Sequence, residues 1–328
     1  MNIWLCAELS AVDQAEWLTA LSTALPGHHV FADRSAVAPQ DIEVAIVANP
    51  PAGSLQGLPN LRLIQSLWAG VDRLLADTSL PAGVPLARMV DPAMNQAMAQ
   101  TALWATLALH RGFFDYQAQQ AALQWRQLPQ SRADEHPVLV LGAGQMGQAT
   151  AQALVHLGYP VTLWRRGAAQ ADKAKSPGAD QSQTLPPAPR FHQVQGQAAL
   201  HAQLAQARVV INLLPLTPNT RGLIDADFLL RLPVGAGLVN LARGAHVVDA
   251  DLLAALDAGH LGRAVLDVFN TEPLPSAHAY WRHPRVSLLP HAAAATDLRS
   301  AAAVAARNVV ALATGQPLQN LILPDRGY

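Results

Sequence analysis

The sequence lacks several features that would place it in a specialised class of protein. It contains one cysteine, so no disulfide can form within the chain. Only 14% of its residues are charged and the formal net charge is −1, so there is no basic field to attract nucleic acid. No uncharged apolar run of about 18 residues occurs, so we expect no membrane-spanning helix.

The sequence is instead rich in apolar residues. They make up 51% of the chain, aromatic residues make up 5%, and the prominence of alanine favours helices packed on sheets. A chain of 328 residues is long for one hydrophobic core and suits two domains. Cys6 lies in the apolar run that starts at Ile3. This run indicates a first strand with a buried thiol rather than a signal peptide, and the expected compartment is the cytoplasm.

Short apolar runs alternate with helical patterns, which predicts an α/β fold with two doubly wound parallel sheets. The predicted strands are 3–6, 43–47, 61–65, 138–141, 161–164, 209–214, 237–241, 263–268 and 286–289. The predicted helices are 13–25, 91–114, 145–157, 250–258 and a last helix from His291 to about Thr314. The segments 115–136 and 167–190 are polar and are expected to be loops, the second of them solvated.

A strand, a glycine turn and a helix follow one another at the start of the second alternating series. Gly142 permits the tight turn, Gly144 lets the backbone approach a pyrophosphate, and Gly147 lets the helix pack against the strand. Gln145 and Met146 open a helix whose free N–H groups can bind phosphate. Three glycines at this spacing are a weak signal alone, but between a strand and a helix they predict a dinucleotide site.

The next predicted strand is followed by two arginines instead of an acid. NAD sites place an Asp or Glu about 20 residues after the glycines to bind the ribose 2′-hydroxyl, whereas this chain has Arg165 and Arg166 there. A guanidinium group binds a 2′-phosphate through charge-assisted hydrogen bonds, which favours NADP(H) over NAD(H). The alternative is an ordinary solvated basic loop.

Three polar residues follow three consecutive predicted strands. Arg243, Glu272 and His291 each come just after an apolar run. In an open parallel sheet, ligands bind at the carboxyl ends of the strands, so these side chains can converge there. Each of them taken alone also suits a solvated loop or a packing role.

The chemistry of carbonyl reduction needs these three residue types. An imidazolium group can deliver a proton to the oxygen on which negative charge develops. A carboxylate bonded to the imidazole orients it and favours its charged form. A guanidinium group can hold a substrate carboxylate with two bonds while polarising the oxo group.

The chain resembles the family of D-isomer-specific 2-hydroxyacid dehydrogenases, and within it the glyoxylate/hydroxypyruvate reductase A group. The motifs that carry the resemblance are 66–72 (SLWAGVD), 142–147 (GAGQMG), 211–222, 240–244 (NLARG), 266–274 (LDVFNTEPL) and 289–296. They cover almost the whole chain in the same order. Six ordered motifs are far more specific than any one of them.

The resemblance implies roles for the residues of these motifs. Arg243 binds and polarises the substrate, His291 is the acid and base, and Glu272 is its partner. The substrate carboxylate is held by backbone amides at Trp68, Ala69 and Gly70. Residues along the cofactor, besides the glycine turn and the two arginines, are Leu214, Pro215, Thr217, Ala242 and Asp267. For Asp267, a structural role at the end of its strand is an equal alternative.

The resemblance also implies the domain organisation and the assembly. A Rossmann dinucleotide-binding domain, 99–290, is inserted in a flavodoxin-like substrate domain made of 1–98 and 291–328. Members of the group form homodimers, and the segment with Tyr116 and Trp125 resembles the arm that crosses to the partner subunit. Trp125 either shapes the neighbouring active site or packs at the interface. No His, Cys or Asp cluster has the spacing of metal ligands, so we expect no metal.

The expected reaction is hydride transfer from NADPH, or from NADH, to glyoxylate or hydroxypyruvate. Trp68 favours such small substrates, although a bulkier 2-oxo acid such as phenylpyruvate, or a sugar-acid relative, is an alternative. A different class of function is that of a dinucleotide-sensing co-repressor, which would have added tails and no need of the three catalytic residues. A methyltransferase would use the glycine turn but would not explain Arg243, Glu272 and His291 together.

Overall fold

The structure is a computed structural model that describes residues 1–167 and 190–322. The chain divides into two compact units. The first contains Met1–Met94 together with the chain from Ala295 onward, and the second is Asn95–Ala294. The predicted loop 167–190 lies outside the described residues except at its two ends. No helix among the described residues is both long and apolar enough to cross a membrane.

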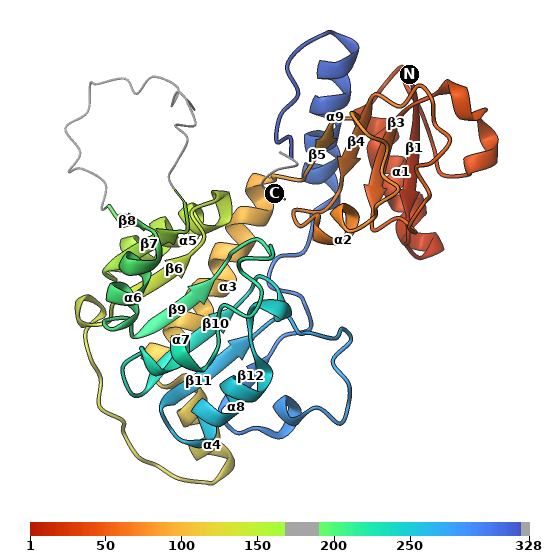
Figure 1. The fold of residues 1–328 in the computed structure, drawn as a ribbon. Helices are drawn as coiled ribbons and strands as arrows, with labels where there is room; N and C mark the ends of the chain where they lie inside the picture. The colour runs from red at the N-terminus through yellow and green to blue at the C-terminus, as the bar shows by residue number, and fades with distance from the viewer. Residues whose placement is uncertain (168–189, 323–328) are drawn as a thin grey trace. The chain divides into compact units, whose positions relative to one another are not determined.

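The first unit is a parallel sheet with helices packed on it (Figure 1). Its elements are β1 (Asn2–Ala7), α1 (Ala11–Ala24), β2 (His29–Phe31), β3 (Ile42–Ala48), β4 (Leu63–Ser66), α2 (Asp72–Leu75), β5 (Leu86–Ala87) and α9 (Leu298–Ala313). The strand order is β2-β1-β3-β4-β5, and every neighbouring pair is parallel. This is the flavodoxin-like order, in which β2 is added on one side of β1 and the later strands are added on the other side, beginning with β3.

The burial of the first sheet accounts for the apolar runs in this part of the sequence. Parallel strands are covered on both faces, so β3 is a nearly unbroken apolar run with six of its seven residues buried. Helix α9 returns to this sheet from the far end of the chain and packs beside α1 and β4. Its buried Asn308 donates from Nδ2 to Gln65 Oε1 at 2.7 Å, which ties α9 to β4. Cys6 is buried as expected, and burial raises its pKa to about 11.

The second unit is a larger parallel sheet in the Rossmann order. Its elements are α3 (Pro92–His110), α4 (Phe113–Ala121), β6 (Val138–Leu141), α5 (Gln145–His156), β7 (Val161–Arg165), β8 (His192–Gln195), α6 (Gln197–Leu204), β9 (Val209–Asn212), α7 (Ala226–Leu230), β10 (Ala236–Asn240), α8 (Asp249–Asp257), β11 (Leu261–Leu266) and β12 (Val286–Leu288). The strand order is β12-β11-β10-β9-β6-β7-β8, all parallel. Short 3₁₀ helices occur at Arg34–Ala36, Pro39–Asp41, Ala133–Glu135, Gly244–His246 and Ala279–Arg282.

Successive strands are added in opposite directions on the two sides of the β6–β9 pair, and the glycine turn lies at that point. Gly142 follows β6 with a φ of +110°, and a Cβ there would lie 2.6 Å from the carbonyl oxygen of Leu213, which follows β9. A Cβ on Gly147 would collide with the carbonyl oxygen of Gly142, so α5 packs tightly on the turn. A Cβ on Gly144 would meet no protein atom within 4 Å. Two of the three glycines are therefore needed by the protein itself, and the third borders open space.

The predicted α/β class with two doubly wound parallel sheets is confirmed, and each predicted strand begins and ends within two residues of its prediction. The prediction of one helix over 91–114 followed by a loop was wrong. Gly112, with a φ of +68°, ends α3, and α4 then starts at Phe113. The strands β2, β5 and β8 were missed because they are short, and β8 is also polar.

The last helix begins later than predicted, at Leu298 instead of near His291. Asp297 caps it by accepting the N–H of Ser300 at 2.9 Å. The alanines after His291 are good helix formers, but the backbone N–H groups of Ala292 and Ala293 donate to Asp267. These bonds hold the segment outside a helix.

We expect Gly147→Ala to destabilise the cofactor-free protein by about 3 kcal/mol, because the added methyl group meets rigid backbone that must shift. The matched variant Gly144→Ala adds the same methyl group in open space and is expected to change stability by less than about 0.5 kcal/mol. Urea denaturation followed by circular dichroism measures both. Equal stabilities of the two variants would show that the turn is less tightly packed than described.

Candidate active site

Arg243, Glu272 and His291 follow three strands that are neighbours in the second sheet. Arg243 lies three residues after β10, Glu272 lies in the loop after β11, and His291 follows β12. Because the strands are parallel, their carboxyl ends lie at one edge of the sheet. The sheet therefore brings three loops together that are widely separated in the sequence.

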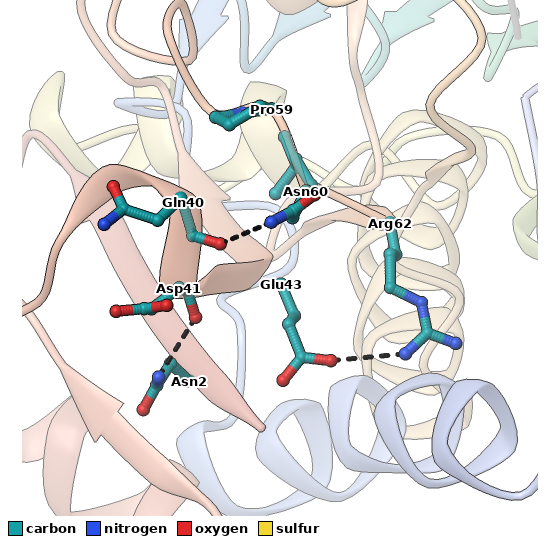
Figure 2. A pocket seen from close by; sticks show the side chains of 8 residues that line it. Asn2, Gln40, Asp41, Glu43, Pro59, Asn60 and Arg62 are labelled. Atoms are coloured by element: carbon teal, nitrogen blue, oxygen red, sulfur yellow. Dashed lines mark hydrogen bonds and ion pairs between the residues drawn. The ribbon is translucent and has the colours of Figure 1, made fainter.

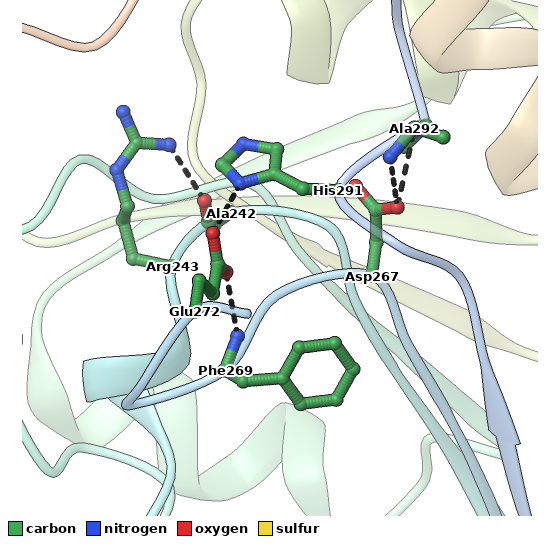
Figure 3. A network of polar contacts seen from close by, with 8 residues as sticks. Ala242, Arg243, Asp267, Phe269, Glu272, His291 and Ala292 are labelled. Carbon is green, nitrogen blue, oxygen red and sulfur yellow. Dashed lines mark hydrogen bonds and ion pairs between the residues drawn. The ribbon is translucent and has the colours of Figure 1, made fainter. Parts of the chain in front are cut away.

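His291 and Glu272 are joined by a hydrogen bond, which Figure 3 shows. The distance between His291 Nδ1 and Glu272 Oε2 is 2.7 Å. A carboxylate can only accept, so the proton of this bond is on Nδ1, and Nε2 is the nitrogen left to exchange a proton with another molecule. The other carboxylate oxygen of Glu272 accepts the backbone N–H of Phe269 at 2.8 Å. Glu272 is thus fixed to its own loop while it orients the imidazole.

The backbone at His291 is held by Asp267, the residue that follows β11. The Asp267 carbonyl oxygen accepts the N–H of His291 at 2.8 Å. Its carboxylate accepts the N–H of Ala292 at 2.6 Å and that of Ala293 at 3.1 Å (Figure 3). Burial raises the pKa of Asp267, and these two amide bonds oppose the rise. The bonds hold His291 at a φ of +53°, a conformation that residues other than glycine seldom adopt.

Arg243 lies against the loop that carries Glu272. A Cβ on the next residue, Gly244, would collide with the backbone of Phe269, so only glycine allows the two loops to touch. The Arg243 Nη1 donates to the carbonyl oxygen of Ala242 at 2.8 Å. The Arg243 carbonyl oxygen accepts from Asn240 Nδ2 at 3.0 Å. Gly244 is a functional residue that the motif 240–244 contains without indicating its role, and its place directly after the arginine is the signal for it.

The glycine turn leaves backbone donors at the start of α5. The helix has no side-chain cap at Gly144. Among the described residues, no acceptor bonds to the backbone N–H groups of Gln145, Met146 or Gly147. Free N–H groups and the partial positive charge of a helix N-terminus suit an anionic group such as a pyrophosphate.

Arg165 and Arg166 lie at the end of β7. The Nε atom of Arg165 is buried and bonds to no acceptor in the described part of the chain, while Arg166 is exposed. A buried guanidinium N–H without an acceptor is unfavourable, so this donor favours an anionic ligand. Together with the open space at Gly144, the residues at this edge fit a dinucleotide with an additional phosphate.

The segment that contains Leu214, Pro215 and Thr217 is folded onto itself. The hydroxyl group of Thr220 accepts the N–H of Thr217 at 2.8 Å and donates to the carbonyl oxygen of Pro215 at 2.8 Å. Leu214 is buried and its N–H donates to Asn212 Oδ1 at 3.2 Å. Thr220 and the buried asparagines that end β9 and β10 were not predicted as site residues. Two successive apolar strands that both end in Asn are the signal that could have found them.

The predicted substrate-binding amides lie in the first unit, after β4. The N–H of Trp68 is already engaged, since it donates to Ser66 Oγ at 3.0 Å. Ser66 Oγ in turn donates to the Trp68 carbonyl oxygen at 3.1 Å, which curls the loop. The backbone N–H groups of Ala69 and Gly70 donate to no acceptor among residues 1–167 and 190–322. These two amides are therefore the ones that remain for a carboxylate.

A surface hollow of about 630 Å³ lies elsewhere in the first unit (Figure 2). It is lined by Asn2, Gln40, Asp41, Glu43, Pro59, Asn60, Leu61 and Arg62. Several of these side chains bind one another or nearby backbone, as in the 3.2 Å ion pair of Arg62 with Glu43. It lies where β1, β3 and β4 begin, whereas open α/β sheets bind ligands where strands end.

No group of His, Cys, Asp and Glu that could hold a metal occurs among the described residues.

The comparisons with known proteins agree in both sequence and structure. Residues 103–293 match the family model described as D-isomer specific 2-hydroxyacid dehydrogenase, NAD binding domain. The chain is 40% identical over 324 residues to glyoxylate/hydroxypyruvate reductase A of Serratia proteamaculans, covering 95% of this chain and 96% of that protein.

Two solved structures have the same fold over the whole chain. A D-isomer specific 2-hydroxyacid dehydrogenase of Xanthobacter autotrophicus Py2, in complex with NADPH and MES, has a TM-score of 0.87 and 36% identity, covering 100% of this chain and 99% of that one. An NADPH-dependent glyoxylate/hydroxypyruvate reductase of Sinorhizobium meliloti, in complex with NADP and sulfate, has a TM-score of 0.85, 29% identity and the same coverage. This chain belongs to the family of D-isomer specific 2-hydroxyacid dehydrogenases.

Proposed function

We propose that this protein is an NADPH-dependent reductase that converts glyoxylate or hydroxypyruvate into the corresponding 2-hydroxy acid. The observation that carries the proposal is the 2.7 Å bond between His291 and Glu272, on loops that adjoin Arg243 in a dinucleotide-binding fold. Relatives named glyoxylate/hydroxypyruvate reductase support it along the whole chain. We assign the reaction to the cytoplasm, in keeping with a single buried thiol.

Each residue has a defined task in this proposal. NADPH supplies the hydride that reduces the oxo carbon. Arg243 holds the substrate and stabilises the negative charge that develops on its oxygen. His291 delivers a proton to that oxygen from Nε2, because Nδ1 is bonded to Glu272. Glu272 keeps the imidazole oriented and stabilises its charged form.

The substrate carboxylate is assigned to the backbone amides of Ala69 and Gly70. They are free donors on a curled loop, and the absence of a side chain at Gly70 allows close approach. We assign to the Trp68 side chain the limit on substrate size, which favours two- and three-carbon acids over phenylpyruvate. A co-repressor would have no use for a histidine and a carboxylate held at hydrogen-bonding distance, so the reductase is the better proposal.

The direct test is loss of NADPH absorbance in the presence of glyoxylate, hydroxypyruvate, pyruvate or phenylpyruvate. We expect rapid, saturable oxidation with glyoxylate or hydroxypyruvate and much lower kcat/KM with phenylpyruvate. His291→Ala should lower kcat by about 100- to 10,000-fold, because proton transfer contributes that much, while the Kd for NADPH stays nearly unchanged.

His260 supplies the control for the histidine substitution. It lies in the same unit, bonded through Nε2 to the Leu229 carbonyl oxygen at 3.0 Å and away from the three loops. His260→Ala should therefore retain kcat. Turnover that survives His291→Ala would disprove the acid/base assignment, and no turnover by the wild-type protein with any of the four acids would disprove the reductase.

The preference for NADPH is assigned to the two arginines after β7. Arg165 has a buried donor that bonds to no acceptor in the described chain, and the 2′-phosphate of NADPH is the anion that distinguishes it from NADH. The exposed Arg166 adds positive charge beside it. The neighbours crystallised with NADPH or NADP support the same cofactor.

Replacing both arginines by serine should raise the KM for NADPH by at least about 10- to 100-fold, since the loss of even one charge-assisted bond costs about 1.5–3 kcal/mol. The KM for NADH should change by less than about threefold, because NADH has no 2′-phosphate. Steady-state kinetics with each cofactor gives the ratio. Arg208→Ser, an exposed arginine where β9 begins, is the control. An equal loss with both cofactors would argue against 2′-phosphate binding.

We propose further that the protein is a homodimer whose interface includes the segment after α4. In that segment Trp125 is fully exposed and Leu123 is 95% exposed, which is unusual for such large apolar side chains. The segment is anchored at Leu128, whose N–H donates to the Tyr116 hydroxyl group at 3.0 Å. It is therefore held in place while its apolar side chains face outward, as suits contact with a second copy of the chain.

Light scattering on a size-exclusion column should give twice the chain mass of 34.8 kDa. Replacing Leu123 and Trp125 together by aspartate should shift the protein toward the monomer, because two charges would be buried in the interface. Leu230→Asp, at another exposed apolar residue of the same unit, should leave the dimer intact. A monomeric wild-type protein would rule the proposal out.

A further inference from the structure

Three polar side chains meet inside the second unit, behind the edge that carries the candidate site. Asn212 is the last residue of β9 and Asn240 is the last residue of β10. His246 is the last residue of the 3₁₀ helix Gly244–His246, which follows Arg243. All three are fully buried, with exposed fractions of 0%. Buried polar groups are unfavourable unless they are bonded, so their bonds show what the cluster holds in place.

The hydrogen bonds of the cluster have one consistent direction. Asn212 Nδ2 donates to Asn240 Oδ1 at 2.9 Å and lies 2.9 Å from His246 Nδ1. Since the amide nitrogen can only donate, His246 Nδ1 accepts and the imidazole proton lies on Nε2. His246 Nε2 lies 3.3 Å from the carbonyl oxygen of Pro215 and donates to it. The amide orientations agree, because Asn212 Oδ1 accepts the N–H of Leu214 and cannot exchange places with Nδ2.

The two ends of this network reach the two halves of the candidate site. At one end, His246 and Asn212 hold Pro215 and Leu214, which are assigned to the cofactor. At the other end, Asn240 Oδ1 accepts the N–H of Ala242 at 3.3 Å and its Nδ2 donates to the Arg243 carbonyl oxygen at 3.0 Å. Asn212 joins the two ends, because its Nδ2 donates both to His246 Nδ1 and to Asn240 Oδ1.

We infer that His246 is a positioning residue. It fixes the position of the cofactor segment at Leu214 and Pro215 relative to the backbone of Arg243. The inference rests on the proposed function for the roles of those two segments. His246 acts with Nδ1 as an acceptor toward Asn212 and with Nε2 as a donor toward Pro215. The two nitrogens have different tasks: Nε2 bonds the cofactor segment directly, whereas Nδ1 is linked to the backbone of Arg243 through Asn212 and Asn240.

Two conservative substitutions separate the two nitrogens. The amide group of Gln reaches as far as Nε2 of histidine, so His246→Gln keeps a donor for Pro215 and loses the acceptor for Asn212. The shorter amide of Asn lies near the position of Nδ1, so His246→Asn keeps the acceptor and loses the donor. His246→Leu fills similar space and loses both.

We expect His246→Leu to raise the Kd for NADPH about tenfold. We also expect it to lower kcat/KM for the oxo acid, measured at saturating NADPH, by about tenfold. Each change is the usual effect of losing one buried hydrogen bond. His246→Gln should restore most of the NADPH affinity, and His246→Asn most of the kcat/KM measured at saturating NADPH. Fluorescence titration measures Kd without turnover. Equal changes of both quantities in the Gln and Asn variants would overturn the assignment.

A purely structural role predicts a different result. His260 also bonds through Nε2 to a backbone carbonyl, so His260→Leu is the matched control that should lower the melting temperature and leave Kd and kcat/KM unchanged. If His246→Leu behaves like this control, His246 is not a positioning residue. If His246→Leu does not fold, the Gln and Asn variants decide the question.

The direction of the network has a test of its own in the cofactor-free protein. Nitrogen-15 spectra of histidine-labelled protein, assigned by comparison with His246→Gln, should show His246 protonated on Nε2 and unprotonated on Nδ1 at pH 7. A proton on Nδ1 would overturn the proposed direction. Absence of reductase activity in the wild-type protein would disprove the proposed function but would leave the position of the His246 proton unaffected. Failure of the proposed function and failure of this inference are therefore distinguishable.

Discussion

The candidate site depends on backbone segments that touch directly at the carboxyl edge of the second sheet. Gly142 lies on the backbone of Leu213, and Gly244 lies on that of Phe269, with no side chain between them. A Cβ at either position would force the loops apart. Loops this close can share hydrogen bonds over short distances, which is why His291 can reach Glu272 and why one buried network can join the ends of β9 and β10. The parallel sheet supplies the edge, and the glycines make it compact.

The polar residues at this edge divide into those that bind backbone and those that face outward. Asp267 is 1% exposed. The side chains of Asp267 and Asn240 form hydrogen bonds with neighbouring amides or carbonyls. The side chains of His291 and Glu272 are 53% and 34% exposed, so they are accessible to another molecule. The buried residues fix the loops and the exposed ones project from them. Such support is what holds a catalytic group in one geometry before the substrate arrives.

The sequence predicts the sheets well because parallel strands are buried on both faces and appear as apolar runs, as 138–141 does for β6. It also indicates the residues that end strands, since a polar side chain after an apolar run stands out. It does not reveal how the ends of β9 and β10 are joined, because Asn212 and His246 bond to residues of other strands and loops, nor does it reveal the break at Gly112 and the helix that follows it. The late start of α9 depends on bonds from Asp267, a residue far away in the sequence, and no local pattern contains that information.

The strained backbone conformation of His291 is stronger evidence for a catalytic function than its position in a motif. A residue with a side chain at a φ of +53° is strained by about 1 kcal/mol or more, and a buried carboxylate whose pKa is raised by desolvation adds a further cost. A fold under no functional demand would avoid this backbone strain with glycine in place of His291. The chain instead keeps histidine there and the buried carboxylate of Asp267 that holds its loop, and the result is an imidazole that is half exposed and oriented by Glu272. Strain of this kind persists where a side chain must be held for chemistry, which favours a reductase over a protein that only binds the dinucleotide.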